Sequence, residues 1–425
     1  MIEPVFAPDE PLAELHAHLG GGVDAATMWE LAHEQGIKVP FPDYWSFAAA
    51  TSVGSGTDGL EGLDRIYHLT ELIQSSPEGV FRAVHGMIAG AYRSQRITTH
   101  EVRFNPAKRN RGGERDLDAI VMAAAHGLDR AMLEYPVRAG LVLMMDRTFP
   151  PELNAQIVER AVRFAGRGVV AVDIGGPRPP GSRAPWDYAG LAPLVRRARA
   201  AGLGVTLHVG EEGVNAPDPE PYLEEMRQAV ALGVDRIGHG IIAAFEPRLA
   251  EALAAREIVL EICPTSNLRT GAVSGEEQAA EVVYALQGAG VPLVVATDGP
   301  EMIGTRLRAE YQLLVRLGAL TRAEARDANA RAPSWPRRRG RATGARRPRS
   351  LNPAMRVTRG ATSPFPRGLI GVRRPHRALR ENALMAPMSK PLAGSRLGRV
   401  AAFPGWGRAA AARAWRWDVR TGGPP

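Results

Sequence analysis

Short apolar runs alternate along residues 1–330 with longer segments in which apolar residues recur every three or four positions. The short runs predict buried strands, and the longer segments predict amphipathic helices. Strands are expected at residues 12–17, 99–104, 140–145, 168–174, 204–208, 236–238, 258–262 and 293–296. Because helical sequence follows each strand, the eight units predict an α/β fold, a (β/α)8 TIM-type barrel over residues 1–330.

The stretch between the first two predicted strands is long. Helices are expected at residues 25–35, where Asp24 would cap the helix, and at 61–75 and 78–95. Between them, residues 40–60 are aromatic and then rich in Ser and Gly, so we expect an irregular segment. An insertion at this point would lie over the carboxyl end of the first strand, as a lid does.

The apolar pattern stops near residue 330. Residues 331–425 hold 22 Lys and Arg, 21 of them Arg, against two acids. The whole chain carries a formal charge of +8, so this segment contributes +20 and residues 1–330 contribute −12. A segment rich in Arg, Pro, Gly and Ala with no apolar period does not pack a core, and we expect a disordered basic tail.

Three interpretations of this tail stay open. It could be unselected sequence, since GC-rich DNA translated in a shifted frame yields Arg, Pro, Gly and Ala. It could be plain disorder, or an arm that binds nucleic acid through its arginines. Reading the gene in its other two frames beyond codon 325 tests the first, because a frameshift predicts that one of them continues an amphipathic helix.

The composition of the chain indicates the cellular compartment in which we expect it. No run of about 18 uncharged apolar residues occurs, so we expect no membrane span. The start, Met-Ile-Glu-Pro, lacks the features of a signal peptide. The single cysteine, Cys263, excludes an internal disulfide and fits a reducing compartment. We therefore expect a cytoplasmic protein.

Polar signatures stand at the ends of four predicted strands. His16 and His18 close the first strand, where residues i and i+2 point to the same face. The others are Thr206–Glu211, Arg236–Gly240 and Thr297–Pro300, after strands 5, 6 and 8. Because the chemistry of such barrels sits at the carboxyl ends of the strands, we expect these four stretches to converge on one pocket.

The residue types in these stretches suit a metal-dependent hydrolase. Three imidazoles and one carboxylate fit Zn²⁺ and leave a position for water, whose pKa the ion lowers towards 7. The four candidate ligands are His16, His18, His208 and Asp298. Glu211 would shuttle a proton, and His239 would orient the attacking hydroxide or stabilise its charge. Taken singly, each histidine could instead be a buried, hydrogen-bonded core residue, and Asp298 a turn former.

These motifs resemble the adenosine deaminase family of the metal-dependent amidohydrolase superfamily. The resemblance covers about residues 10–325 and rests on Ala13–Leu19, His208–Glu211, Arg236–Gly240, Cys263–Asn267 with Thr270–Val273, and Thr297-Asp298. It implies a barrel enzyme that removes the amino group from a purine C6 with water and releases ammonia. It also implies one zinc ion per chain, bound by the four ligands named above.

The resemblance also implies the remaining roles. Glu211 would protonate the purine N1, His239 would hold the attacking hydroxide, and the backbone amide of Gly176 would contact the purine. Adenosine-specific members have aspartate where this chain has Gly20, to bond the ribose hydroxyls, and where it has Gly299, to bond N7. We therefore expect a purine nucleoside-like small molecule as substrate and inefficient turnover of adenosine, unless other residues substitute. The candidates are Asp146, Arg147, Arg103 and Asn105, although each of them could instead support a strand end.

Alternatives remain at this stage. The chain could deaminate adenine, an N6-modified AMP or aminodeoxyfutalosine, or bind a nucleoside without turning it over. A nucleic-acid-binding protein is the alternative from another class and rests on the tail alone. A two-metal hydrolase would place a lysine at the end of strand 4, which here reads Val172–Gly176. The family pattern needs further helical sequence after Leu320–Ala332 to cover strands 8 and 1, so we expect an incompletely sealed barrel if the tail is genuine.

Overall fold

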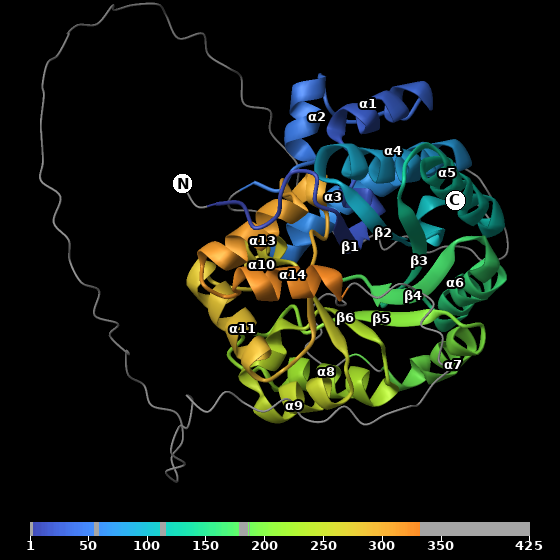
Figure 1. The fold of residues 1–425 in the computed structure, drawn as a ribbon. Helices are drawn as coiled ribbons and strands as arrows, with labels where there is room; N and C mark the ends of the chain where they lie inside the picture. The colour runs from blue at the N-terminus through green and yellow to red at the C-terminus, as the bar shows by residue number, and fades with distance from the viewer. Residues whose placement is uncertain (1–2, 55–58, 111–115, 178–185, 187, 332–425) are drawn as a thin grey trace, which may run out of the picture. The chain divides into compact units, whose positions relative to one another are not determined.

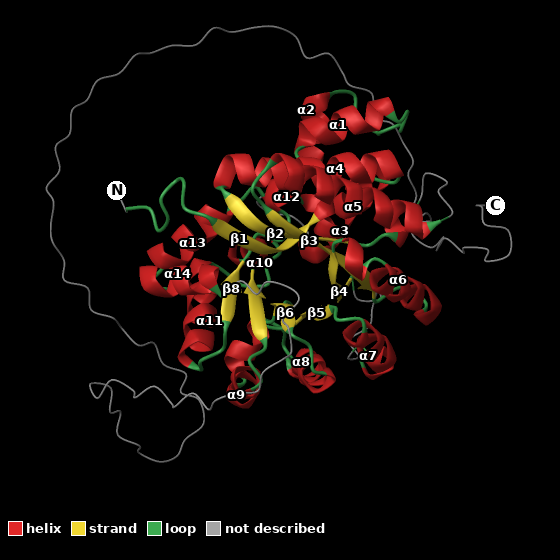
Figure 2. Cartoon of the chain, turned by 45° about the vertical axis from the view of Figure 1, so that its right-hand side comes forward, coloured by secondary structure: helices red, strands yellow, loops and turns green. Residues whose placement is uncertain are grey.

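The computed structural model describes residues 3–331 except 55–58, 111–115, 178–185 and 187. Eight parallel strands follow one another around a single sheet in chain order, with helices outside them (Figure 2). The strands are β1 Leu12–His18, β2 Ile97–Phe104, β3 Arg138–Asp146, β4 Val169–Gly175, β5 Gly204–Val209, β6 Arg236–His239, β7 Val259–Ile262 and β8 Leu293–Val295. The predicted (β/α)8 barrel is confirmed. The predicted tail, apart from Arg331, lies outside the described residues.

The helices cover the outer face of the strands (Figure 1). They are α1 Ala25–Glu34, α2 Tyr44–Ala50, α3 Gly59–Ile73, α4 Pro77–Gln95, α5 Leu117–Glu134, α6 Pro151–Arg163, α7 Ala192–Ala200, α8 Glu220–Leu232, α9 Pro247–Ala255, α10 Pro264–Arg269, α11 Glu276–Gly288, α12 Pro300–Ile303, α13 Leu307–Arg316 and α14 Arg322–Ala330. Short 3-10 turns follow β1 (η1, Leu19–Gly21) and β2 (η2, Ala107–Arg109). Among the described residues, none of the helices has the length and apolarity to cross a membrane.

The seam between β8 and β1 is closed at the carboxyl end of the strands. The His18 amide donates to the Asp298 carbonyl at 2.6 Å, and the Asp298 amide donates to the His16 carbonyl at 2.9 Å. Helix α14 packs against both strands, and its Asn329 side chain accepts the Ala13 amide at 2.9 Å. A capping box at Thr321 starts this helix in the last residues before the tail, so part of the seam is covered. The further helical sequence that the family pattern needs after residue 332 falls outside the described residues.

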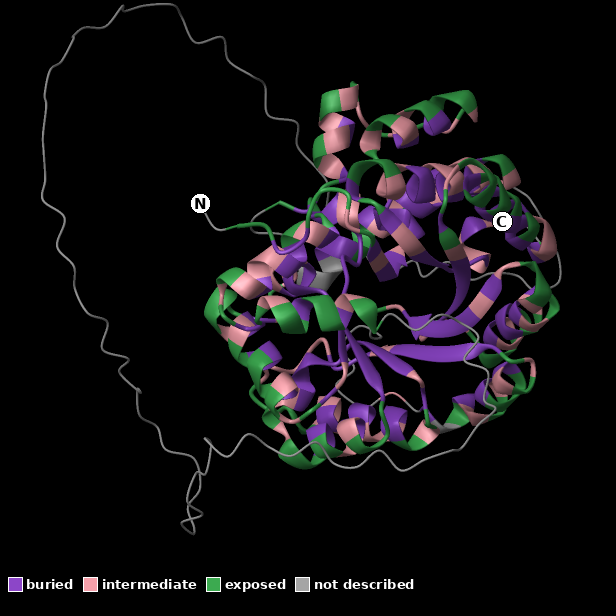
Figure 3. Cartoon of the chain, viewed as in Figure 1, coloured by how far each residue is buried: buried purple, intermediate pink, exposed green. Residues whose placement is uncertain are grey.

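Burial follows from this arrangement. Helices cover the outside of the strands and side chains fill the inside, so almost every strand residue is buried (Figure 3). Most of these residues are aliphatic, as the apolar runs predicted. The exceptions include five charged side chains in the barrel interior, namely Glu101, Arg103, Asp173, Arg236 and Glu261. They lie directly beneath the candidate site.

The insertion after β1 differs from its prediction in one respect. Residues 44–50 form helix α2 where an irregular segment was expected. The Asp43 carboxylate accepts the Ser46 amide and caps this helix, and Phe47 is buried beneath it. Helix α3 packs against η1 at the carboxyl end of β1, and the Val53 amide donates to the Met302 carbonyl at 2.8 Å. Covering of this strand end therefore comes mainly from α3.

Candidate active site

The structure brings the four predicted metal ligands together. His16 and His18 lie on β1, His208 on β5, and Asp298 follows β8. The Nε2 atom of His18 lies 2.9 Å from Nε2 of His208 and 3.3 Å from Nε2 of His16. It also lies 3.3 Å from Oδ1 of Asp298. The three imidazoles form a group whose nitrogen atoms could hold one metal ion.

Hydrogen bonds fix which nitrogen of two imidazoles carries the proton. Nδ1 of His16 lies 2.7 Å from a Glu261 oxygen, and Nδ1 of His208 lies 3.0 Å from an Asp173 oxygen. Because a carboxylate only accepts, both Nδ1 atoms carry protons and both Nε2 atoms present lone pairs. Burial lowers the pKa of His16 and His18 well below the ordinary value, so these rings are neutral. Lone pairs facing one another beside a carboxylate repel unless a cation lies between them, so this donor set fits Zn²⁺.

A network of buried charges supports these two histidines. Arg103 donates to Asp173 at 2.9 Å and to Glu261 at 2.7 Å, and it also donates to the Leu15 carbonyl. Arg236 pairs with Glu261 at 2.9 Å and bonds Glu101. Burial would lower the pKa of Arg103, but the two carboxylates raise it. We call Glu101, Arg103, Asp173, Arg236 and Glu261 the floor network.

Of the two interpretations of Arg103, substrate contact and structural support, the structure agrees with structural support. Its side chain is fully buried, and three acceptors inside the barrel engage its guanidinium. Asn105 and Asp146 form turns instead of facing a free pocket. Asn105 accepts the amides of residues 107 and 108, and Asp146 accepts from Thr148 and pairs with Lys108 at 2.8 Å.

Glu211 and His239 face each other beside the imidazoles. Oε2 of Glu211 lies 3.6 Å from Nε2 of His239. Asn267 donates to Nδ1 of His239 at 3.0 Å, so the neutral ring carries its proton on Nε2. Burial raises the pKa of Glu211, so this group holds a proton at higher pH than an exposed glutamate. The pair therefore places a carboxyl group with a raised pKa and an imidazole Nε2 on one side of the site.

The local backbone supports this placement. His239 and Asp298 adopt left-handed φ values of 64° and 63°, uncommon for residues other than glycine. Residues held in such conformations cluster at functional sites. Gly238 precedes His239, and a Cβ there would lie 2.7 Å from Cε1 of His16. Only glycine leaves room for that imidazole.

The Asp298 carboxylate is held at both oxygens. Ser266 donates to Oδ2 at 2.7 Å, and the Tyr67 hydroxyl donates to Oδ1 at 3.4 Å. Burial alone would raise the pKa of Asp298, but His18 and His239 lower it below its ordinary value. Asp298 therefore stays ionised and can bind a cation.

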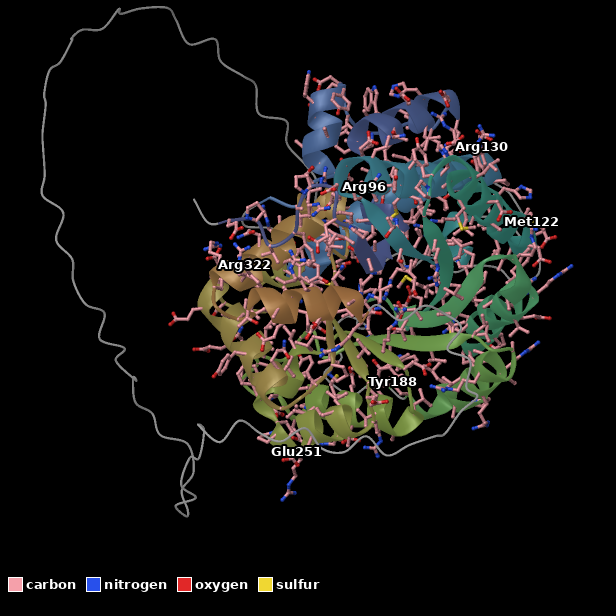
Figure 4. All side chains as sticks on the ribbon, in the orientation of Figure 1. Arg96, Met122, Arg130, Tyr188, Glu251 and Arg322 are labelled. Atoms are coloured by element: carbon pink, nitrogen blue, oxygen red, sulfur yellow. The ribbon has the colours of Figure 1, made fainter. Side chains whose placement is uncertain are left out.

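The three glycines proposed to lie at the substrate are also at strand ends. Gly176 follows β4 with φ +93°, and a Cβ there would lie 2.6 Å from an Asp146 oxygen. Arg147 donates to the Gly176 carbonyl at 2.7 Å and to the Tyr188 hydroxyl at 3.1 Å (Tyr188 is labelled in Figure 4). Gly20 lies in η1 and Gly299 precedes α12, both next to Tyr67.

Several residues of the site were missed in the sequence. Asp173 and Glu261 each stand as a lone acid inside an apolar strand, which is a usable signal because buried carboxylates need partners. Ser266 and Asn267 lie in a motif that was quoted without a role for either. Tyr67 gave no signal, because it reaches the site from a helix that is distant in sequence.

Cys263 takes part in a second possible ligand group, with His16 and His239. Burial raises the pKa of its thiol well above the ordinary value. The thiolate, which is the form that binds metals, is therefore disfavoured. The group of three histidines is the better cation site.

Comparison with known proteins agrees with this geometry. The adenosine deaminase family model matches residues 11–335. The chain belongs to the adenosine deaminase family. It is therefore a hydrolase acting on C–N bonds of cyclic amidines, a deaminase of the metal-dependent amidohydrolase type.

Three of the proteins to which this chain is similar are deaminases. Aminodeoxyfutalosine deaminase of Acidothermus cellulolyticus is 34% identical over 74% of this chain and 85% of its own length. Adenosine deaminase of Vibrio vulnificus is 26% identical over 74% of this chain and 91% of its own. The structure of Arabidopsis N6-mAMP deaminase is 25% identical with a TM-score of 0.62, over 76% of this chain and 92% of that one. Related Arabidopsis structures are complexes with IMP and with GMP, so similar folds hold small nucleotides.

Proposed function

We propose that this adenosine deaminase family member is a zinc-dependent deaminase of a 6-aminopurine nucleoside or a close relative. The observation that carries the proposal is the convergence of three neutral imidazoles and the Asp298 carboxylate beside a Glu211 with a raised pKa. The overall reaction adds water across the C6–N bond, leaving a 6-oxopurine and ammonia.

His16, His18, His208 and Asp298 would hold the metal ion. When bound, zinc lowers the pKa of water towards 7 and so supplies hydroxide near neutral pH. Glu211 donates its proton to N1 of the purine as C6 becomes tetrahedral. Nε2–H of His239 orients the attacking oxygen, because Asn267 keeps Nδ1 in the acceptor state. The backbone amide of Gly176 positions the ring.

Aminodeoxyfutalosine is the first candidate substrate, and adenosine is disfavoured. The support is the higher identity to the aminodeoxyfutalosine deaminase than to the adenosine deaminase, 34% against 26%. A second support is the absence of a carboxylate at Gly20 and Gly299. Losing a hydrogen bond to a charged group costs about 1.5–3 kcal/mol each.

The test combines metal analysis with an ammonia-release screen on the full chain. We expect about one zinc per chain, as in a single-metal catalytic site. Release should be fastest with aminodeoxyfutalosine in a panel that includes adenine, adenosine, deoxyadenosine, AMP and N6-methyl forms. Folded protein without zinc would refute the metal centre. Zinc without ammonia release from any compound would instead support a barrel that binds nucleosides without turnover.

A further inference from the structure

Three glycines surround the side chain of Tyr67. A Cβ at Gly20 would lie 2.8 Å from Cδ1 of the tyrosine ring, closer than real Cβ atoms approach a neighbour. Added Cβ atoms at Gly21 and Gly299 would each lie 3.3 Å from its hydroxyl oxygen. The last two are also crowded by Met302, at 3.0 and 2.9 Å. A larger residue at any of the three positions therefore has to displace Tyr67, Met302 or nearby backbone.

Backbone conformation does not explain these glycines. Gly299 has φ −127°, a value open to any residue, and neither Gly20 nor Gly21 has a positive φ. Glycine is therefore found at these positions because neighbouring atoms leave no room for a side chain. The space at Gly20 is taken by the ring of Tyr67, which comes from helix α3.

Tyr67 in turn contacts two of the proposed metal ligands. Its hydroxyl donates to Oδ1 of Asp298 at 3.4 Å, on the opposite oxygen from the Ser266 bond. Its ring lies 5.6 Å from that of His18, centroid to centroid. The helix that carries Tyr67 is fixed by a small apolar cluster of Val53, Leu63, Ile66, Met302 and Ile303, against which Tyr67 packs.

We propose that Tyr67 is the positioning residue that orients the Asp298 carboxylate, and that position 20 is glycine because the tyrosine ring needs the space. This inference rests on the proposed function for the role of Asp298. The two hydroxyl donors, Ser266 and Tyr67, fix the rotation of the carboxylate plane about its terminal bond. The Tyr67 side chain next to residue 20 is uncharged, in contrast to an aspartate at that position. An aspartate at residue 20 is compatible with the fold only when residue 67 has a smaller side chain.

The first experiment measures zinc affinity. Metal-free full-length Tyr67→Phe is titrated with Zn²⁺ against a competing chelator, next to wild type and Tyr284→Phe, an exposed tyrosine on α11. Loss of the hydroxyl should weaken zinc binding by about tenfold, the lower end of the effect of removing a hydrogen-bond partner of a metal ligand. Tyr284→Phe should match wild type. An unchanged affinity in Tyr67→Phe overturns the positioning role.

The second experiment is a double-mutant cycle on thermal unfolding in the presence of chelator, so it depends on neither metal nor substrate. Gly20→Ala should lower Tm by roughly 3 °C in the wild-type background, as overpacking does. In the Tyr67→Ala background the same change should have little effect. Equal shifts in both backgrounds would show that Tyr67 is not what residue 20 makes room for. If wild type binds no zinc, the proposed function fails and this cycle alone decides the inference.

Discussion

Deep in the barrel, the side chains that hold the proposed ligands are fully buried and bond at 2.7–3.0 Å, through Glu261 on His16 and Asp173 on His208. At the mouth, the side chains that would meet substrate make longer contacts. Oε2 of Glu211 lies 3.6 Å from Nε2 of His239, and Oε1 of Glu211 lies 3.5 Å from the Thr270 hydroxyl. The imidazoles of the metal site are therefore held by shorter bonds than Glu211, the proposed proton donor.

The difference between the barrel interior and its mouth can be tested by substitutions in each region. Changes in the floor network should remove stability and metal affinity together, because its members are buried charges that pair with one another and with the proposed ligands. Changes at the mouth should reduce turnover while the protein stays folded and loaded. The predictions below are ordered from the largest expected effect to the smallest.

Arg103→Leu should have the largest effect. It leaves the carboxylates of Asp173 and Glu261 buried without their shared cation, which costs about 3–5 kcal/mol of folding free energy. Chemical denaturation measures the loss of stability, and zinc content measures the loss of metal affinity. Arg130→Leu, an exposed arginine paired with Glu134 on α5 (labelled in Figure 4), is the matched control and should cost about 0–1 kcal/mol. Equal costs for both variants would mean that the floor network does not support the site.

Glu211→Gln should abolish most ammonia release without loss of zinc. The amide cannot protonate N1, so kcat should fall by about 10²–10⁴-fold while thermal stability stays near wild type. Glu212→Gln, the adjacent acid, is the control. In wild type, kcat/KM should decline as pH rises through the raised Glu211 pKa, because only the protonated form donates. Retention of near wild-type turnover in Glu211→Gln would remove this residue from the mechanism.

Asn267→Leu should have an intermediate effect confined to turnover. It removes the donor to Nδ1 of His239, so the ring is free to adopt the other tautomer. One neutral hydrogen bond is worth about 1 kcal/mol, or roughly fivefold in kcat. Asn215→Leu, an exposed asparagine bonded to Gln278, is the comparison variant. A drop in zinc affinity larger than the drop in kcat would assign Asn267 to the metal support instead.

His100→Phe should have the smallest effect, on pH dependence alone. His100 lies on the same strand as Arg103 but is an isolated buried group whose Nδ1 has no partner among the described residues. Burial lowers its pKa to about 4 from an ordinary 6.5. The unfolded chain therefore takes up a proton first, and stability is lost as pH falls from 6.5 towards 4.

Removing this histidine should regain about 1 kcal/mol at pH 5.5, relative to pH 8, in denaturation curves. The exposed His33→Phe should leave the pH dependence unchanged. If both variants keep the wild-type slope between pH 4 and 6.5, the acid sensitivity comes from other groups.

The sequence predicted the barrel and the convergence of strand ends because both depend on local patterns. An H-x-H pair on a strand, or a Thr-Asp after one, is read within a few residues. Helix α2 was missed because only seven residues form it and Asp43, rather than an apolar period, starts it. The role of Arg103 stayed open because an arginine at a strand end looks the same whether it faces substrate or two buried acids.

The environment of Gly20 lay beyond sequence reasoning for a different reason. The residue that crowds it is 47 positions away, on a helix whose approach to β1 depends on how the whole insertion packs. A missing aspartate could be seen in the sequence, but the tyrosine that fills the space could not. The roles of Gly20, Gly176 and Gly299 at a substrate stay predictions.

The bonds that close the barrel belong to the residues that would hold the metal. The amides of His18 and Asp298 bridge the first and last strands, and the side chains of the same residues face the proposed ion. An ion that binds only the folded chain adds its binding free energy to the folded state. Amide hydrogen exchange at these two positions should therefore slow on metal loading more than exchange in the middle of β3. The metal would therefore stabilise the β8–β1 seam, where the first and last strands of the barrel meet.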